Sequence, residues 1–162
     1  MTKNQFWMKL DQLTKKKDKS NILSDCAEIM RQAYEEDLGL IIGCIHELQD
    51  PESVHQLYLA MTNSKPEPVA NRYLLCYTSK EQAKRDKLLP EGFEVISVRA
   101  VVDNALNKKV IGGLIFNQAD EAHSLLLPKA FLTESDADTL EAMGDMLRIA
   151  ARVYREHPES EA

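Results

Sequence analysis

The sequence lacks a long hydrophobic run, an even set of cysteines and an excess of basic residues, and each absence excludes a class of protein. No apolar run approaches the roughly 20 residues that a membrane-spanning helix needs, and residues 1–7 lack the apolar core of a secretion signal. Cys26, Cys44 and Cys76 lie far apart in apolar segments, which is typical of reduced, buried thiols. We therefore expect a cytoplasmic protein with no membrane contact, no disulfide framework and no zinc site.

The charge balance argues against nucleic acid as a partner. The chain has 20 basic and 26 acidic residues, a net charge of −6. Binding to a phosphate backbone depends on an excess of lysine and arginine, which is missing here. Hydrophobic residues at 44% and charged residues at 28% are ordinary for a globular protein, and 162 residues suit one domain with one core.

The first twenty residues predict a helix followed by a lysine-rich link, ahead of a single domain over residues 21–162. The apolar face of this helix is formed by Phe6, Leu10 and Leu13, with Trp7 beside them. An aromatic stripe of this kind either packs on its own domain or anchors another protein. Self-packing is the reading we favour, and docking is the alternative.

Apolar spacing of three and four residues predicts further helices over residues 22–33, 38–48 and 51–61. The second of these is based on Leu38, Ile41, Ile42, Ile45 and Leu48. The third would begin at Pro51, where the missing amide hydrogen of proline is harmless.

After a loop over residues 63–68, the pattern changes to short strands alternating with helices. Strands are predicted over residues 73–77, 93–98, 110–116 and 124–127, the last two as an antiparallel hairpin. Helices are predicted after the cap at Ser79, over residues 98–106, and from about Thr133 to before Pro158. The expected fold is α+β: a mixed β-sheet of about four strands, from residues 72–127, flanked by N-terminal helices and a long C-terminal helix.

The segment from about Val54 to Leu132 resembles the N-terminal domain of the SseB family of bacterial proteins. The resemblance rests on the order of elements, on Thr78-Ser79 with the charged helix after it, and on Gly113-Leu114-Ile115-Phe116-Asn117 before a hairpin. Family members often carry proline after this asparagine, where the present chain has Gln118. The resemblance implies an SseB-like α+β domain and brings no agreed catalytic residues.

Two features suggest chemistry but have simpler explanations. Cys44 and His46 invite a thiol nucleophile, yet residues two apart on a helix point about 200° apart, which favours a buried cysteine and a surface histidine. Gly112-Gly113 falls inside a strand rather than before a helix, so close packing explains the pair better than a phosphate loop does. The histidines show no metal-ligand spacing, and we expect neither metal nor cofactor.

Polar residues at the strand ends are the best candidate site. Thr78, Ser79 and Asn117 follow strands, and Arg99 begins a helix after a strand, at the sheet margin where α/β proteins often bind ligands. The alternative is that these side chains only cap helices and turn the backbone.

No acid, base and nucleophile converge in the sequence, so we expect a non-catalytic binding or regulatory module for an unidentified protein or small-molecule partner. The alternative is a small thiol-dependent or hydrolytic enzyme using Cys44 or Cys76. A homo-oligomer formed through a sheet edge or the first helix is compatible with both.

Overall fold

The computed structural model describes residues 1–47, 49–60, 71–87 and 92–132. It begins with two helices, α1 (Lys3–Lys15) and α2 (Ile22–Glu35), which confirms the prediction for this part of the chain. A capping box starts α1, because Thr2 and Gln5 satisfy each other's backbone amides. Phe6, Leu10 and Leu13 are buried in the same core as α2, so the apolar face of α1 packs on its own chain.

The two helices predicted over residues 38–48 and 51–61 are wrong. The chain forms three strands there: β1 (Gly39–Glu47), β2 (Asp50–Gln56) and β3 (Tyr58–Ala60). In β1, Ile42 faces one side of the sheet and Ile41 the other, and both are fully buried. A strand buried on both faces has no polar alternation, so its apolar residues can imitate the spacing of a helix.

The rest of the chain alternates strands and short helices largely as predicted. These elements are β4 (Arg72–Tyr77), α3 (Lys80–Arg85), β5 (Phe93–Ser97), α4 (Val98–Asn107), β6 (Ile111–Phe116), the 3-10 turn η1 (Glu121–His123), β7 (Leu125–Pro128) and the 3-10 turn η2 (Lys129–Leu132). The hairpin of β6 and β7 is antiparallel, as expected. The prediction of a long C-terminal helix falls on residues 133–162, outside the described residues.

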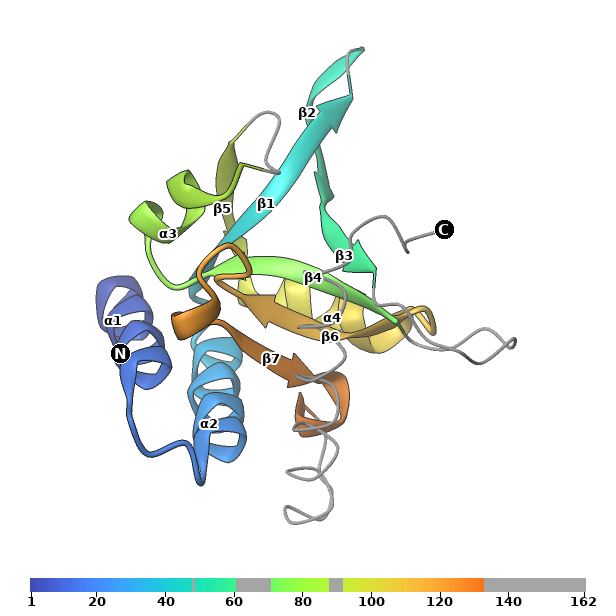
Figure 1. Cartoon of the computed structure of the whole chain (residues 1–162). Helices are drawn as coiled ribbons and strands as arrows, with labels where there is room; N and C mark the ends of the chain where they lie inside the picture. Colours follow the sequence, from blue (N-terminus) through green and yellow to red (C-terminus); the bar gives the residue numbers. More distant parts are fainter. Residues whose placement is uncertain (48, 61–70, 88–91, 133–162) are drawn as a thin grey trace.

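The sheet is mixed and has seven strands rather than about four, because β1, β2 and β3 belong to it. Its central pair, β4 and β6, is parallel, and the other pairings are antiparallel. The strand β1 pairs with β4 and β5 near its start and with β2 toward its end. Figure 1 shows the hairpin of β1 and β2 projecting away from the sheet, on the side opposite α1 and α2.

Helices cover the two faces of the sheet unequally. The helices α1, α2 and α4 share the larger core with one face, whose buried residues include Leu40, Leu114 and Phe116. The opposite face carries a smaller cluster around Tyr77 and Ile115, against which α3 packs through Ala83. Of the helices in the described ranges, none has the length and apolar character needed to cross a membrane.

Candidate functional site

The carboxyl ends of β4 and β6 bring Thr78 and Asn117 together. Asn117 Oδ1 accepts a hydrogen bond from the backbone amide of Thr78 at 3.0 Å, and its Nδ2 donates to the Thr78 hydroxyl at 2.9 Å. The same Nδ2 donates to the carbonyl of His123 at 3.2 Å. Asn117 has a φ of 55°, a left-handed conformation that asparagine tolerates better than most residues. The backbone of Asn117 therefore turns the chain after β6, and its side-chain amide joins the ends of the two strands.

The helix α1 lies against this end of the sheet. The hydroxyl of Thr78 donates to Asp11 Oδ1 at 2.8 Å, and Asp11 Oδ2 pairs with Lys15 at 2.8 Å. One helical turn earlier, the indole nitrogen of Trp7 donates to the carbonyl of Gly39 at 2.9 Å. The strand margin that the sequence indicated as a ligand site is thus covered in part by the chain's own first helix.

A second polar cluster centres on the carboxylate of Asp120, in the turn between β6 and β7. Its Oδ2 accepts hydrogen bonds from Gln82 at 2.9 Å and Arg85 at 2.9 Å, and contacts Nδ1 of His123 at 2.7 Å. Burial acts to raise the pKa of Asp120, but these hydrogen bonds and the neighbouring positive charges lower it overall. The cluster fixes α3 to the turn. Gln82 Oε1 is buried without a hydrogen-bond donor among the described residues.

Ser79 and Arg99 have clear structural contacts. The hydroxyl of Ser79 accepts from the amide of Gln82 at 3.2 Å and so caps α3. The guanidinium of Arg99 donates to the carbonyls of Tyr34 at 2.7 Å and Glu35 at 2.8 Å, which are the last carbonyls of α2. The structure therefore brings together Thr78, Ser79 and Asn117, and places Arg99 at the end of α2 instead. Whether any of the four binds a ligand stays a prediction.

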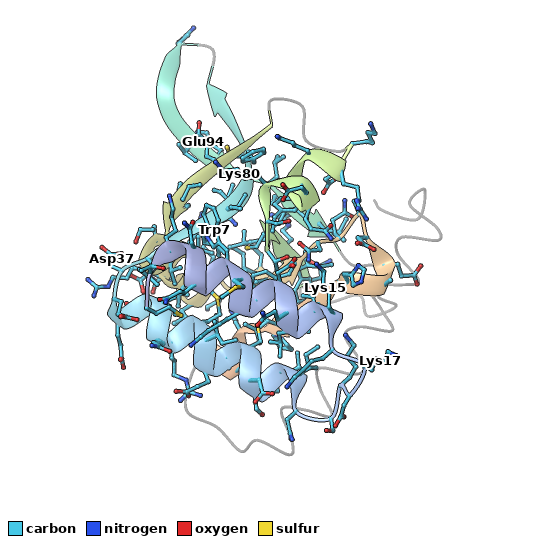
Figure 2. All side chains as sticks on the ribbon, turned by 90° about the vertical axis from the view of Figure 1, so that its left-hand side faces the viewer. Trp7, Lys15, Lys17, Asp37, Lys80 and Glu94 are labelled. Carbon is cyan, nitrogen blue, oxygen red and sulfur yellow. The ribbon has the colours of Figure 1, made fainter. Side chains whose placement is uncertain are left out.

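An open cleft of about 440 Å³ lies between α1 and the junction of β4 with α3. We call it the α1–α3 cleft, and it is lined by Asn4, Trp7, Met8, Asp11, Thr78, Ser79, Lys80 and Glu81. Figure 2 looks onto α1 and shows Trp7 and Lys80 on the side of this helix away from α2. The cleft combines an aromatic ring and an exposed thioether with charges of both signs.

The cysteines are poorly placed for nucleophilic chemistry. Cys26, Cys44 and Cys76 form no disulfide, and all three are buried. Burial raises the pKa of Cys76 far above its ordinary value, which disfavours the reactive thiolate. The helical argument that separated Cys44 from His46 fails, because both lie on the strand β1; the side chain of His46 is outside the described part.

The sequence analysis did not connect Asp11, Gln82 and Asp120 with the site at the strand ends. A signal for Asp11 exists, since it is an acidic residue just beside the predicted apolar stripe of the first helix. The other two are ordinary polar residues of a helix and a turn, and only the tertiary fold brings them together. Within the described ranges, no group of three or more His, Cys, Asp or Glu side chains could hold a metal ion.

The site consists of a polar network that joins α1, α3 and the ends of β4 and β6, with the α1–α3 cleft beside it. No protein-family model matches the chain, and comparisons with curated proteins and with solved structures found no matching protein.

Proposed function

We propose that the protein is a non-catalytic binding module that takes a segment of a partner protein into the α1–α3 cleft. The proposal rests on two side chains of α1 that line the cleft, Trp7 and Met8. Met8 is 52% exposed, although it is a large apolar side chain. Methionine adapts its shape to different apolar groups, and tryptophan is a frequent anchor at protein interfaces.

Trp7 is held in place before any partner arrives. Its indole N–H donates to the carbonyl of Gly39, and the ammonium of Lys3 lies 5.1 Å from its ring centre. Holding a large side chain in one conformation reduces the entropy lost on binding. The charged groups of Lys80 and Glu81 on the opposite wall would select polar groups beside the apolar side chain that enters.

The polar residues at the base of the cleft support binding rather than catalysis. Thr78 donates to Asp11 and accepts from Asn117, and Ser79 caps α3. These hydroxyls are engaged in holding elements together, and neither contacts a histidine in the described network. A nucleophile needs an adjacent base to activate it. The resemblance to the SseB family agrees with this proposal and stays a prediction.

The first test compares capture of proteins from a cell lysate by four forms of the chain. These are the wild type, Met8→Glu, Lys80→Glu and Val110→Glu. Val110 is the matched control, because it is a similarly exposed apolar residue, 40% accessible, outside the cleft lining. We expect the amount of a protein captured by the wild type to fall at least about tenfold with both Met8→Glu and Lys80→Glu, and to be unchanged with Val110→Glu.

Fluorescence provides an independent readout, because Trp7 is the single tryptophan of the chain. Titration with the captured protein should shift its emission and saturate, with a weaker response in Met8→Glu. The partner used should contain no tryptophan, or should carry phenylalanine in place of each tryptophan, so that the measured emission comes from Trp7 alone. Equal capture by all four forms, or unchanged Trp7 emission on binding, would remove the support for the cleft.

A further inference from the structure

A second hollow lies between α2 and α4, on the helical side of the molecule. This α2–α4 groove has a volume of about 160 Å³ and is mostly apolar, with Met30, Tyr34, Val102, Leu106 and Leu132 in its lining. Leu106 is 38% exposed there. An accessible leucine in an apolar groove costs free energy in water, which an apolar occupant would recover.

The last described residue of the chain, Leu132, lines this groove. Leu132 ends η2 and is the last residue before residues 133–162. Six residues of extended chain span at most about 21 Å, so a helix beginning near Asp138 would start within that distance of Leu132. A tethered segment this close has a high effective concentration at the groove, which a free partner would have to exceed.

The sequence of this segment has the pattern of a groove-binding helix. Its apolar residues at helical spacing are Leu140, Met143, Leu147, Ala150 and Tyr154. At 100° per residue they fall within a stripe of about 80°, and they extend over about 21 Å. The α2 helix has 14 residues and therefore about the same length. A narrow stripe suits insertion between two helices better than it suits covering a broad sheet face.

Charge favours the same occupant. Arg31 and Glu35 of α2 line the groove beside its apolar floor. Among the described residues, Arg31 pairs with exposed Glu28 of its own helix at 3.6 Å, a contact that contributes little in water. The segment after Leu132 is acidic at its start, with Glu134, Asp136, Asp138 and Glu141, and carries arginines further on. Because Arg31 and Leu132 line the same groove, we expect the acidic residues that follow Leu132 in the sequence to pair with Arg31.

We propose that residues 138–155 form an amphipathic helix that docks in the α2–α4 groove of the same chain. The docked helix would add a fourth helix to α1, α2 and α4, which share one face of the sheet. The proposal is independent of the α1–α3 cleft, since the two hollows share no lining residue.

Hydrogen–deuterium exchange of the full-length protein tests the docking. The forms compared are the wild type, Leu106→Glu, Leu147→Glu and the control Val110→Glu, which changes an exposed residue outside the groove. We expect amides 140–154 to be protected in the wild type and in Val110→Glu. Their exchange should become at least about tenfold faster in both leucine variants, while the amides of β4 and β6 keep their protection.

Three results would overturn the proposal. The first is unprotected exchange over residues 140–154 in the wild type. The second is protection that survives in both Leu106→Glu and Leu147→Glu. The third is protection that grows with protein concentration together with a doubled mass in solution, which would make a second copy the occupant. Leu147→Glu keeps the test valid should Leu106→Glu fail to fold.

Discussion

The hydroxyl of Thr78, at the end of β4, donates to Asp11 of α1 at 2.8 Å, across 67 residues of sequence. Thr78 is 1% exposed and its hydroxyl also accepts from Asn117. One buried hydroxyl thus connects the first helix to two central strands. Apolar packing of Phe6 and Leu10 holds α1 against the core, and this polar link fixes its position along the sheet.

Thr78→Val should lower the free energy of unfolding by about 1–3 kcal/mol, because Asp11 and Asn117 each lose a partner. Asp11→Ala should also destabilise, and the double variant should lose less than the sum, with a coupling of about 0.5–3 kcal/mol. Urea denaturation of the four forms measures this cycle. Strictly additive losses would show that the two side chains do not interact.

Asn117→Ala and Asn117→Gly separate the side chain of Asn117 from its backbone. Both variants lose the hydrogen bonds to Thr78 and His123, but only alanine must also hold the left-handed φ of 55°. We expect alanine to be less stable than glycine by about 1 kcal/mol. Thermal unfolding measures the order of the two, and a more stable alanine variant would contradict the role of the turn.

Gly113→Ala should be among the most damaging single changes. A Cβ at Gly113 would lie 2.0 Å from the carbonyl oxygen of Leu127 in β7, so the pairing of β6 with β7 must shift. Gly92→Ala is the control, because its φ is also positive and, apart from its chain neighbours, no heavy atom of the described residues lies within 4 Å of the added Cβ. We expect a loss of about 3 kcal/mol or more at Gly113 and about 1 kcal/mol at Gly92, measured by denaturant unfolding.

The carboxylate of Asp120 should make stability depend on pH. Its pKa is lowered in the folded protein, so its contribution is present above the ordinary value of 3.8 and is lost as pH falls through the folded-state pKa. The stability difference between wild type and Asp120→Asn should therefore shrink as the pH is lowered from about 5 to about 2. Chemical denaturation at several pH values measures it, and a constant difference would contradict the assignment.

The three cysteines should resist iodoacetamide in the native protein. All are buried, and burial raises the pKa of Cys76. At neutral pH we expect modification at least about a hundredfold slower than in guanidinium chloride, where the same thiols are exposed. Mass spectrometry follows the labelling. Rapid native modification of Cys44 or Cys76 would instead favour the thiol enzyme considered from the sequence.

The sequence predicted well wherever local chemistry determines structure. The capping serine at Ser79 correctly placed the start of α3, and the apolar run before Asn117 correctly placed β6. It failed over residues 38–61, and in β1 the reason is that burial on both faces removes the alternation that identifies a strand. The glycines and three isoleucines of β1 were evidence against a helix there, because both residue types disfavour a helix interior.

The candidate site was predicted in part for a related reason. Thr78 and Asn117 follow parallel strands, and the sheet brings them together as such a topology requires. Arg99 follows β5, which lies beyond β1, so its side chain reaches the end of α2 rather than Asn117. Asp11 joins the network only because α1 packs against the sheet, and no local sequence pattern predicts that tertiary contact.

The order of pairing in the sheet has a consequence for synthesis on the ribosome. The strand β1 pairs with β5 through residues 93–97, and α1 and α2 bury their apolar faces against strands that follow them. A nascent chain should therefore expose Phe6, Leu10 and Met30 at least until residues 93–97 have been translated. Polypeptides that expose such surfaces during elongation are the usual clients of ribosome-associated chaperones.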